Sequence, residues 1–325
     1  MIVVTGGSGF IGTHLVRLLL ERGEKVRIVD CREPAKDIAQ AVDYAHVDIR
    51  DYSTLRNAFC GADVVYHLAA NPQLWTPRRG DFFRVNYWGT VHVLQASLHS
   101  GVRRVVHVST ESILTRPGQT GVIAENQDVS RREVIGPYCL SKWRAERYAW
   151  LLGRAGAPVI IVNPTLPIGP GDWLRTPPTQ MILDVCLGKR PVYVAGELNL
   201  IDVRDVALGL IAAAERGRPV HRYVLGAENW TIRQLFDVVA RLAHVPPPRW
   251  RIPYSLALTV AYANEFLADL TGYPPQAAIT GVKLTRRRMH FDNRRTWEML
   301  QVHPRPIMQS LEEMISWFRE VRWIP

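Results

Sequence analysis

A glycine-rich turn between the first apolar run and the first helical pattern constrains the fold more than any other feature. The apolar run Ile2–Thr5 leads directly into residues 6–12, where glycines recur as Gly6, Gly9 and Gly12 and also satisfy G-x-G-x-x-G. Such glycines permit a tight turn, let the backbone approach a pyrophosphate, and let the following helix pack closely on the strand. The amides at the start of that helix can then bind the anion. The turn predicts a dinucleotide-binding site.

Asp30 lies 18 residues beyond Gly12, at the end of the second apolar run. A carboxylate at this place accepts hydrogen bonds from the adenosine ribose diol and repels a 2′-phosphate, which favours NAD over NADP. Arg32 is two residues further on and would suit a phosphate, so NADP stays an alternative. Asp48, after the third run, is expected to accept a hydrogen bond from the adenine amino group.

Apolar runs and amphipathic stretches alternate through the first half of the chain, which is typical of βαβ units around a parallel sheet. The fold class is therefore α/β, with a Rossmann-type doubly wound parallel sheet and a smaller C-terminal α/β substrate lobe. Prolines cluster after residue 164. We place the NAD-binding domain at 1–165 and the substrate lobe at 166–325. Later strands near 193–195 and 222–225 are expected to return to the main sheet. The predicted strands are 2–5, 25–30, 44–48, 64–68, 105–109 and 159–163, and the predicted helices 11–22, 52–59, 86–100 and 137–154.

Tyr138 and Lys142 are four residues apart on a predicted helix and so share one face. A phenol is a poor acid or base at neutral pH, but a neighbouring ammonium stabilises the phenolate and lowers its pKa. Thr110, at the end of the fifth predicted strand, is the candidate hydroxyl for holding the same substrate oxygen. The three residues together predict a site for proton transfer.

These motifs resemble the extended short-chain dehydrogenase/reductases, the NAD-dependent epimerase/dehydratase group. The segment 163–172 and the run 198–207 most resemble the hopanoid-associated sugar epimerase branch, from which Asp30 and Asp202 depart. The resemblance implies that Tyr138 is the general acid/base, that Lys142 holds the nicotinamide ribose and tunes Tyr138, and that Thr110 fixes the reacting oxygen. A homodimer formed through the helices at 86–100 and 137–154 is also implied. The residues that carry the resemblance are Thr5–Gly12, Asp30, Asp48, His67–Ala70, Asn86, Ser109-Thr110, Tyr138–Lys142 and Asn163–Thr165.

The resemblance also implies a set of binding residues. In related sugar dehydratases an acidic pair follows the threonine, whereas this chain has Glu111-Ser112, which disfavours dehydration. Arg175 or Arg204 is expected to clamp a diphosphate. The expected cofactor contacts are Gly6, Gly9, Phe10, Ile11, Gly12, Asp30, Arg32, Asp48, Ile49, Leu68, Ala69, Ala70, Val108, Tyr138, Lys142 and Pro164. The expected substrate contacts are Asn71, Trp75, Glu111, Ser112, Asn163, Arg175 and Arg204.

Three functions remain open from the sequence. The leading hypothesis is an NAD-dependent epimerase of a sugar or nucleotide sugar that works through a keto intermediate. The alternative is an NAD(P)-dependent dehydrogenase or reductase of a small or lipid-like alcohol. A non-catalytic dinucleotide-binding scaffold is the third, and the intact Thr110, Tyr138 and Lys142 argue against it.

The chain carries 40 Lys and Arg against 30 Asp and Glu, a formal charge of +10 with a pI near 9.7. The basic residues are scattered, apart from Arg286–Arg288 and the nearby Arg294-Arg295, so we expect a basic surface suited to small anions and no nucleic-acid partner. The four cysteines show no zinc spacing, which predicts no metal and a reducing, cytoplasmic compartment. The apolar stretch 256–270 is interrupted by acids and predicts a core helix, with a lipid-lined pocket as the alternative, and no transmembrane segment.

Overall fold

The computed structural model describes residues 1–325 and contains a seven-stranded, wholly parallel sheet in the order β10-β6-β5-β4-β1-β2-β3. The strand order reverses between β1 and β4, and ligands of such sheets bind outside the carboxyl ends of the strands at that point. The predicted fold class is confirmed. The strands are β1 (Ile2–Thr5), β2 (Val26–Asp30), β3 (Asp43–His46), β4 (Val64–His67), β5 (Arg104–Val108), β6 (Val159–Pro164) and β10 (Arg222–Leu225).

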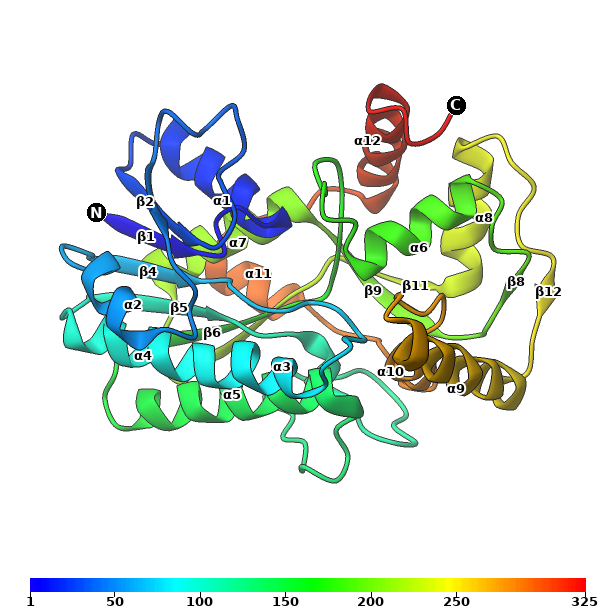
Figure 1. The fold of residues 1–325 in the computed structure, drawn as a ribbon, viewed down its shortest axis with the longest axis horizontal. Helices are drawn as coiled ribbons and strands as arrows, with labels where there is room; N and C mark the ends of the chain where they lie inside the picture. The colour runs from blue at the N-terminus through cyan, green and yellow to red at the C-terminus, as the bar shows by residue number, and fades with distance from the viewer.

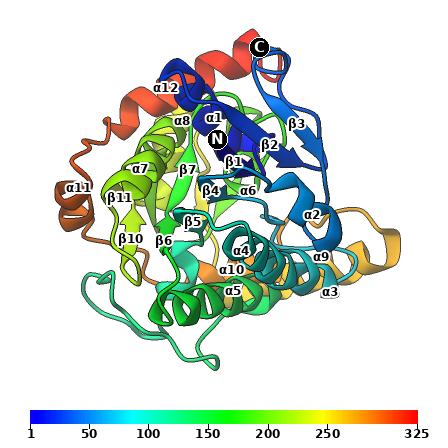
Figure 2. The same ribbon diagram turned by 90° about the vertical axis from the view of Figure 1, so that its left-hand side faces the viewer.

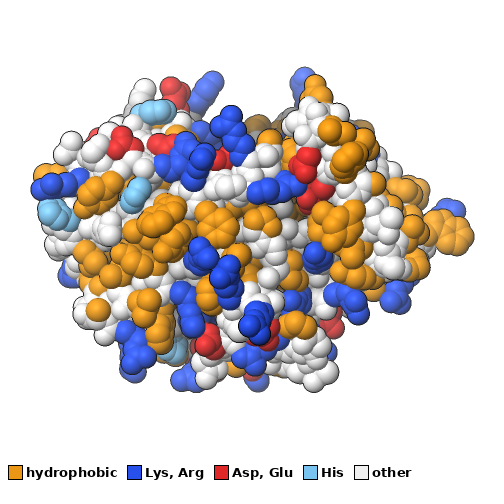
Figure 3. All heavy atoms as spheres, turned by 60° about the horizontal axis from the view of Figure 1, so that its bottom comes forward, with side chains coloured by type: hydrophobic (Ala, Val, Ile, Leu, Met, Phe, Trp, Pro, Cys, Tyr) orange, Lys and Arg blue, Asp and Glu red, His pale blue; other side chains and the backbone are white.

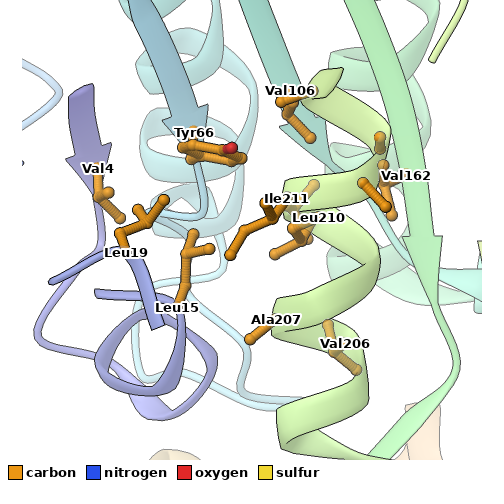
Figure 4. Close-up of a cluster of buried hydrophobic side chains, with 14 of the residues drawn as sticks. Val4, Leu15, Leu19, Tyr66, Val106, Val162, Val206, Ala207, Leu210 and Ile211 are labelled. Atoms are coloured by element: carbon orange, nitrogen blue, oxygen red, sulfur yellow. The ribbon is translucent and has the colours of Figure 1, made fainter. Parts of the chain in front are cut away.

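Helices cover both faces of the sheet (Figures 1 and 2). The faces are buried because alternate residues of each strand point to opposite sides. In β1, Val4 joins the core under α1 and α7, shown in Figure 4, whereas Val3 joins the core under α2, α4 and α5. One layer holds α1 (Phe10–Glu21), α7 (Val203–Arg216) and α11 (Arg294–Leu300); the other holds α2 (Tyr52–Ala58), α4 (Thr90–His99) and α5 (Gly136–Arg154).

A second lobe lies beside the sheet and has its own core (Figure 1). It contains a three-stranded sheet in the order β11-β9-β7 and a two-stranded sheet of β12 and β8. None of the helices of the protein is both long enough and apolar enough to cross a membrane. The elements of this part are β7 (Leu166–Ile168), α6 (Pro177–Cys186), β8 (Val192–Tyr193), β9 (Glu197–Asp202), β11 (Glu228–Thr231), α8 (Ile232–Leu242), β12 (Trp250–Arg251), α9 (Tyr254–Thr271), α10 (Ile279–Leu284) and α12 (Ile307–Glu320).

Two expectations about elements need correction. The strand predicted near 193–195 does not return to the main sheet: β8 pairs with β12 instead, although β10 does join β6 as expected. The edge position beside β6 is taken by β10, so β8 is left to a separate sheet. The predicted helix 86–100 divides into the π-helical turn η1 (Phe83–Gly89) and α4, and the short helix α3 (Gly80–Phe82) precedes it. A 3-10 turn, η2 (Glu111–Leu114), follows β5.

Candidate active site

The glycine turn is packed too closely for side chains. Gly6 has φ 73°, and a Cβ there would lie 2.5 Å from the backbone nitrogen of Ala69. A Cβ on Gly12 would lie 2.2 Å from the carbonyl oxygen of Gly6. The turn therefore lies against the end of β4, and α1 begins immediately after it at Phe10. This is the geometry that brings the first amides of a helix close to a pyrophosphate.

Asp30 is buried at the end of β2, with only 5% of its surface exposed. Its two carboxylate oxygens accept hydrogen bonds from the backbone amides of Ser8 and Arg32, each at 3.1 Å. Each oxygen keeps further acceptor capacity for a ribose diol. The Arg32 side chain is half exposed, with Nε 3.8 Å from Asp30. Ser8 was missed by the sequence analysis; its hydroxyl donates to the carbonyl of Arg32 and ties the glycine turn to the end of β2.

The remaining expected cofactor contacts follow the ends of neighbouring strands. Leu68, Ala69 and Ala70 extend directly from β4. The partly exposed Asp48 carboxylate forms a bidentate pair with Arg50, with N to O distances of 3.0 and 2.6 Å, and its expected contact with the adenine stays a prediction. Ile49 is buried.

Tyr138 stands in the first turn of α5, which has Pro137 at a favourable early position. Burial raises the pKa of Tyr138, the neighbouring Cys139 and Glu111 add to the rise, and a hydrogen bond with Thr110 opposes it. The edge of the phenol ring packs against Phe82, with centroids 6.1 Å apart. Thr110 and Tyr138 therefore lie near each other at the carboxyl end of β5, and their joint catalytic role stays a prediction.

Lys142 is buried one turn later on α5. Its Nζ donates to the carbonyl oxygen of Val108 at 2.7 Å, and burial lowers its pKa to about 8, an effect that Glu146 opposes. The expected lowering of the Tyr138 pKa by Lys142 is not found, because burial dominates at the phenol and the ammonium points to Val108. The ammonium has three donors, so two remain for a bound ribose.

Behind Thr110 lies a buried polar network. Asn163 is fully buried and donates through Nδ2 to the Thr110 carbonyl at 2.9 Å and to Glu146 at 2.7 Å. Arg222 from β10 pairs with the same Glu146 carboxylate at 2.5 Å. The expectation that Asn163 lines the substrate site is therefore wrong, because its side chain is enclosed and holds the end of β5 in place.

Glu111 and Ser112 surround the Thr110 hydroxyl. The Thr110 hydroxyl donates to Glu111 Oε2 at 2.8 Å and lies 3.1 Å from the Ser112 hydroxyl, which also accepts from Cys139 at 3.5 Å. Burial raises the pKa of Glu111 to about 7, while its hydrogen bond from Thr110 opposes the rise. A second group able to exchange a proton near neutral pH therefore lies beside the hydroxyl pair.

Several side chains that are expected to contact the substrate interact with other residues of the protein. Arg204 pairs bidentately with Asp202 at 2.9 and 2.7 Å and with Glu313 at 2.5 Å. The Arg175 guanidinium lies over the Trp323 ring, 4.1 Å from its centroid. Arg204 is therefore engaged by carboxylates, whereas Arg175 keeps its hydrogen-bond donors and its expected diphosphate contact stays a prediction. Trp75 is buried and donates to Asp269 at 3.0 Å, while the Asn71 side chain accepts from Gln73 in its own loop.

An open cleft of about 570 Å³ gathers arginines that the sequence analysis did not assign to a site. The Arg287 guanidinium is partly buried and donates to the Glu133 carbonyl at 2.5 Å, and its Nη1 has no partner. The dense run Arg286–Arg288 is the signal for this cleft in the sequence, where it indicates only a basic surface. The cleft is lined by Tyr193, Arg233, Arg251, Arg286, Arg287 and Arg288, among others.

Comparison with known proteins identifies the class. The model of the NAD dependent epimerase/dehydratase family matches residues 2–226, and the chain belongs to that family. It is an NAD-dependent enzyme of the extended short-chain dehydrogenase/reductase type, as the resemblance implied. The narrower likeness to the hopanoid-associated branch stays a prediction.

Among individual relatives, a putative dihydroflavonol 4-reductase of Synechocystis is 33% identical over 322 residues, covering 97% of this chain and 94% of the relative. Sterol demethylase protein B of Methylococcus capsulatus is 32% identical over 98% of both chains. The crystal structure of gox2253 superposes with a TM-score of 0.88 at 34% identity, covering 100% of this chain and 99% of that one. The fold is also shared with the NAD complex of Thermus thermophilus UDP-glucose 4-epimerase, at a TM-score of 0.78 and 22% identity over 98% of both chains.

Proposed function

We propose that this enzyme is a dehydrogenase or reductase that interconverts a secondary alcohol and a ketone with NAD as the hydride carrier. The observation that carries the proposal is the meeting of the Thr110 and Tyr138 hydroxyls at the end of β5, with the buried Lys142 behind them. The glycine turn and Asp30 fit the pyrophosphate and ribose of the dinucleotide. When bound, the nicotinamide accepts or supplies the hydride.

The chain's own groups supply position and proton transfer. In the reductive direction Tyr138 gives a proton to the carbonyl oxygen, and in oxidation it takes the proton from the alcohol. Thr110 donates a hydrogen bond to the same oxygen once substrate replaces Glu111 as its acceptor. Lys142 brings a positive charge close to the site and holds the ribose with the donors not used by Val108. Glu111 is placed to bind a further hydroxyl or to exchange a second proton.

The curated relatives support reduction over epimerisation. The two relatives above bear the names of a reductase and of a sterol demethylation protein, and a third, from Stigmatella aurantiaca, is a ketoreductase at 30% identity over 290 residues. The pairing of Arg204 with Asp202 and Glu313 also engages one of the two arginines expected to clamp a diphosphate. A ketone on a ring or lipid-like skeleton is therefore the favoured substrate class.

The arginine-lined cleft favours a second candidate, the epimerase of a nucleotide sugar. Arg233, Arg251 and Arg286 offer the donors that a diphosphate needs. An epimerase must retain its cofactor, because the hydride returns to the same carbon after the ketone turns over.

The state of the cofactor separates the two candidates. The enzyme is purified without added nucleotide, the bound NAD is released and quantified, and NADH oxidation is followed with cyclic and sterol-like ketones. We expect an empty, exchanging site and ketone-dependent turnover. Stoichiometric NAD together with interconversion of a UDP-, GDP- or dTDP-sugar would establish the epimerase instead.

We also infer a homodimer through α4 and α5 and a division near residue 165 between the cofactor and substrate parts. Support for the dimer comes from apolar side chains exposed near and on these helices, Trp88 at 52% and Leu151 at 60%. Sedimentation of the wild type and of Leu151→Glu tests this: the variant should dissociate to monomers.

A further inference from the structure

Helix α9 reverses the usual distribution of side chains between the buried and the exposed side of a helix. It buries a stripe of small residues, Ala257, Ala261 and Ala268, together with Glu265, and it points large apolar side chains outward. Phe266 is 65% exposed, Leu267 58% and Leu270 70%. Since consecutive helical residues are about 100° apart, the outward residues share roughly half of the circumference. We call this surface the α9 face; its residues are Leu256, Val260, Tyr262, Phe266, Leu267, Leu270 and the adjoining Tyr273.

The acidic residues of α9 are all engaged by the body of the protein. Asp269 and Glu265 both pair with Arg79, at 3.0 and 2.9 Å, and Asp269 also accepts from Trp75. Glu265 further accepts from the backbone amide of Ile279 at 2.6 Å. The α9 face thus carries no unpaired carboxylate: the half-exposed Asp269 adjoins it and is neutralised by Arg79.

The exposed polar side chains of α9 donate back to the helix. The hydroxyls of Thr259 and Thr271 donate to carbonyls four residues earlier, at 3.1 and 2.8 Å, and the Asn264 amide does the same at 2.9 Å. Such bonds leave these donors satisfied without water. The α9 face can therefore lose its hydration at little polar cost.

Basic and aromatic side chains border the α9 face. Lys283 lies over the Tyr262 ring and Arg286 over the Tyr254 ring, with the cations 5.8 and 4.7 Å from the ring centroids. Just before α9, Arg249 and Arg251 are exposed on either side of Trp250, whose exposure is 70%. None of these four basic residues has an acidic partner within 4.0 Å. Figure 3 views the side on which α5 and α9 lie, where hydrophobic side chains are interspersed with Lys and Arg.

We propose that the α9 face binds the surface of an anionic lipid bilayer. A helix of large apolar residues bordered by Tyr, Trp and unpaired Lys and Arg matches the boundary between acyl chains and negatively charged headgroups. A border of unpaired basic residues fits that surface better than it fits a second copy of this chain, whose α9 would bring the same charge. Binding at this boundary is peripheral, because the helix does not cross the bilayer. It also gives a role to part of the net charge of +10, which is larger than nucleotide ligands need. The inference does not depend on which reaction the enzyme catalyses.

Vesicle flotation of the full chain tests the proposal, using phosphatidylcholine alone and phosphatidylcholine with 30% phosphatidylserine. We expect binding to the anionic vesicles that falls when salt is raised from about 0.1 to 0.5 M. Phe266→Ser with Leu270→Ser should weaken binding about tenfold or more, and Lys283→Gln about fivefold. The matched control is Val122→Ser, an exposed apolar residue outside both the α9 face and the helices of the proposed dimer, which should bind as the wild type does.

Two results would overturn the proposal. One is the absence of vesicle binding, or binding that the Phe266→Ser and Leu270→Ser pair leaves unchanged although circular dichroism shows a folded protein. The other is a dimer in sedimentation that this pair dissociates while neither form floats, which would make the α9 face a contact between copies. Enzyme turnover in solution tests the proposed function independently of vesicle binding. Phe266 and Leu270 lie outside the residues assigned to the active site, so their substitution should leave turnover unchanged.

Discussion

Helices α5 and α9 have almost the same length, 19 and 18 residues, yet each reverses the usual rule for what a helix buries. Helix α5 buries Lys142 and Glu146, whereas α9 exposes leucines and a phenylalanine. In α5 every buried charge has a partner, since Lys142 meets a carbonyl and Glu146 meets Arg222. In α9 the exposed leucines and Phe266 have no partner within the protein. The difference teaches that a buried polar group marks internal chemistry, whereas an exposed apolar group marks an external contact.

The largest expected effect comes from removing the phenol of α5. Tyr138→Phe should lower kcat by about a thousandfold, because the phenol is the group assigned to pass the proton directly to the substrate oxygen. NADH oxidation with the best ketone measures it. Tyr148→Phe, on the same helix and bonded only to Gln95, is the control and should keep normal turnover. Equal losses in both variants would contradict the assignment of Tyr138.

The buried charge pair of α5 should dominate stability. Arg222→Met leaves the Glu146 carboxylate without its cation and should lower the free energy of unfolding by about 3 kcal/mol, measured by urea denaturation. Arg103→Met removes the exposed pair with Asp63 and should cost less than about 1 kcal/mol. If the two variants lose the same stability, the buried Arg222–Glu146 pair contributes no more than an exposed one.

The acid beside Thr110 should make stability depend on pH. Because burial raises the pKa of Glu111 from 4.5 to about 7, the folded state favours its protonated form. That stabilisation is fully present below about pH 4.5 and is lost as pH rises through 7. Glu111→Gln should therefore be about 2 kcal/mol more stable than the wild type at pH 8 and gain nothing at pH 4. A gain of the same size at both pH values would contradict the raised pKa.

The smallest effect should come from the outward side of α9. Phe266→Ser should change the free energy of unfolding by less than about 0.5 kcal/mol, because the Phe266 side chain is mostly exposed to water and its removal takes away little buried apolar surface. Ala261→Leu, on the buried side of the same helix, should cost about 2 kcal/mol by overpacking. Thermal unfolding of both variants sharpens the contrast. A large loss in Phe266→Ser would mean that this residue packs inside the protein.

The first half of the chain could be predicted because its signals are local. Short apolar runs rich in valine and isoleucine placed β1, β2 and β4 to within one or two residues, and the spacing of Tyr138 and Lys142 placed both on α5. A glycine turn between a strand and a helix has few structural alternatives. The functional roles of these residues still stay predictions.

The failures have a common cause, which is a partner supplied by a distant segment. Asn163 is enclosed by Glu146, and Arg204 is held by Glu313 from α12. The strand predicted near 193–195 does not join the main sheet, because β10, nearly thirty residues later, occupies the position beside β6. No local pattern reports such competition.

The sequence by itself determined the family, the parallel sheet and the dinucleotide turn, since hydrophobic period and glycine spacing act within a few residues. Tertiary structure alone decided which arginines are free, how burial sets the pKa of Tyr138 and Glu111, and which side of α9 faces outward. From the sequence alone, the apolar stretch 256–270 predicts a core helix. Its orientation depends on Arg79 and Trp75, which bind Glu265 and Asp269 from about 190 residues away along the chain and turn the small residues inward.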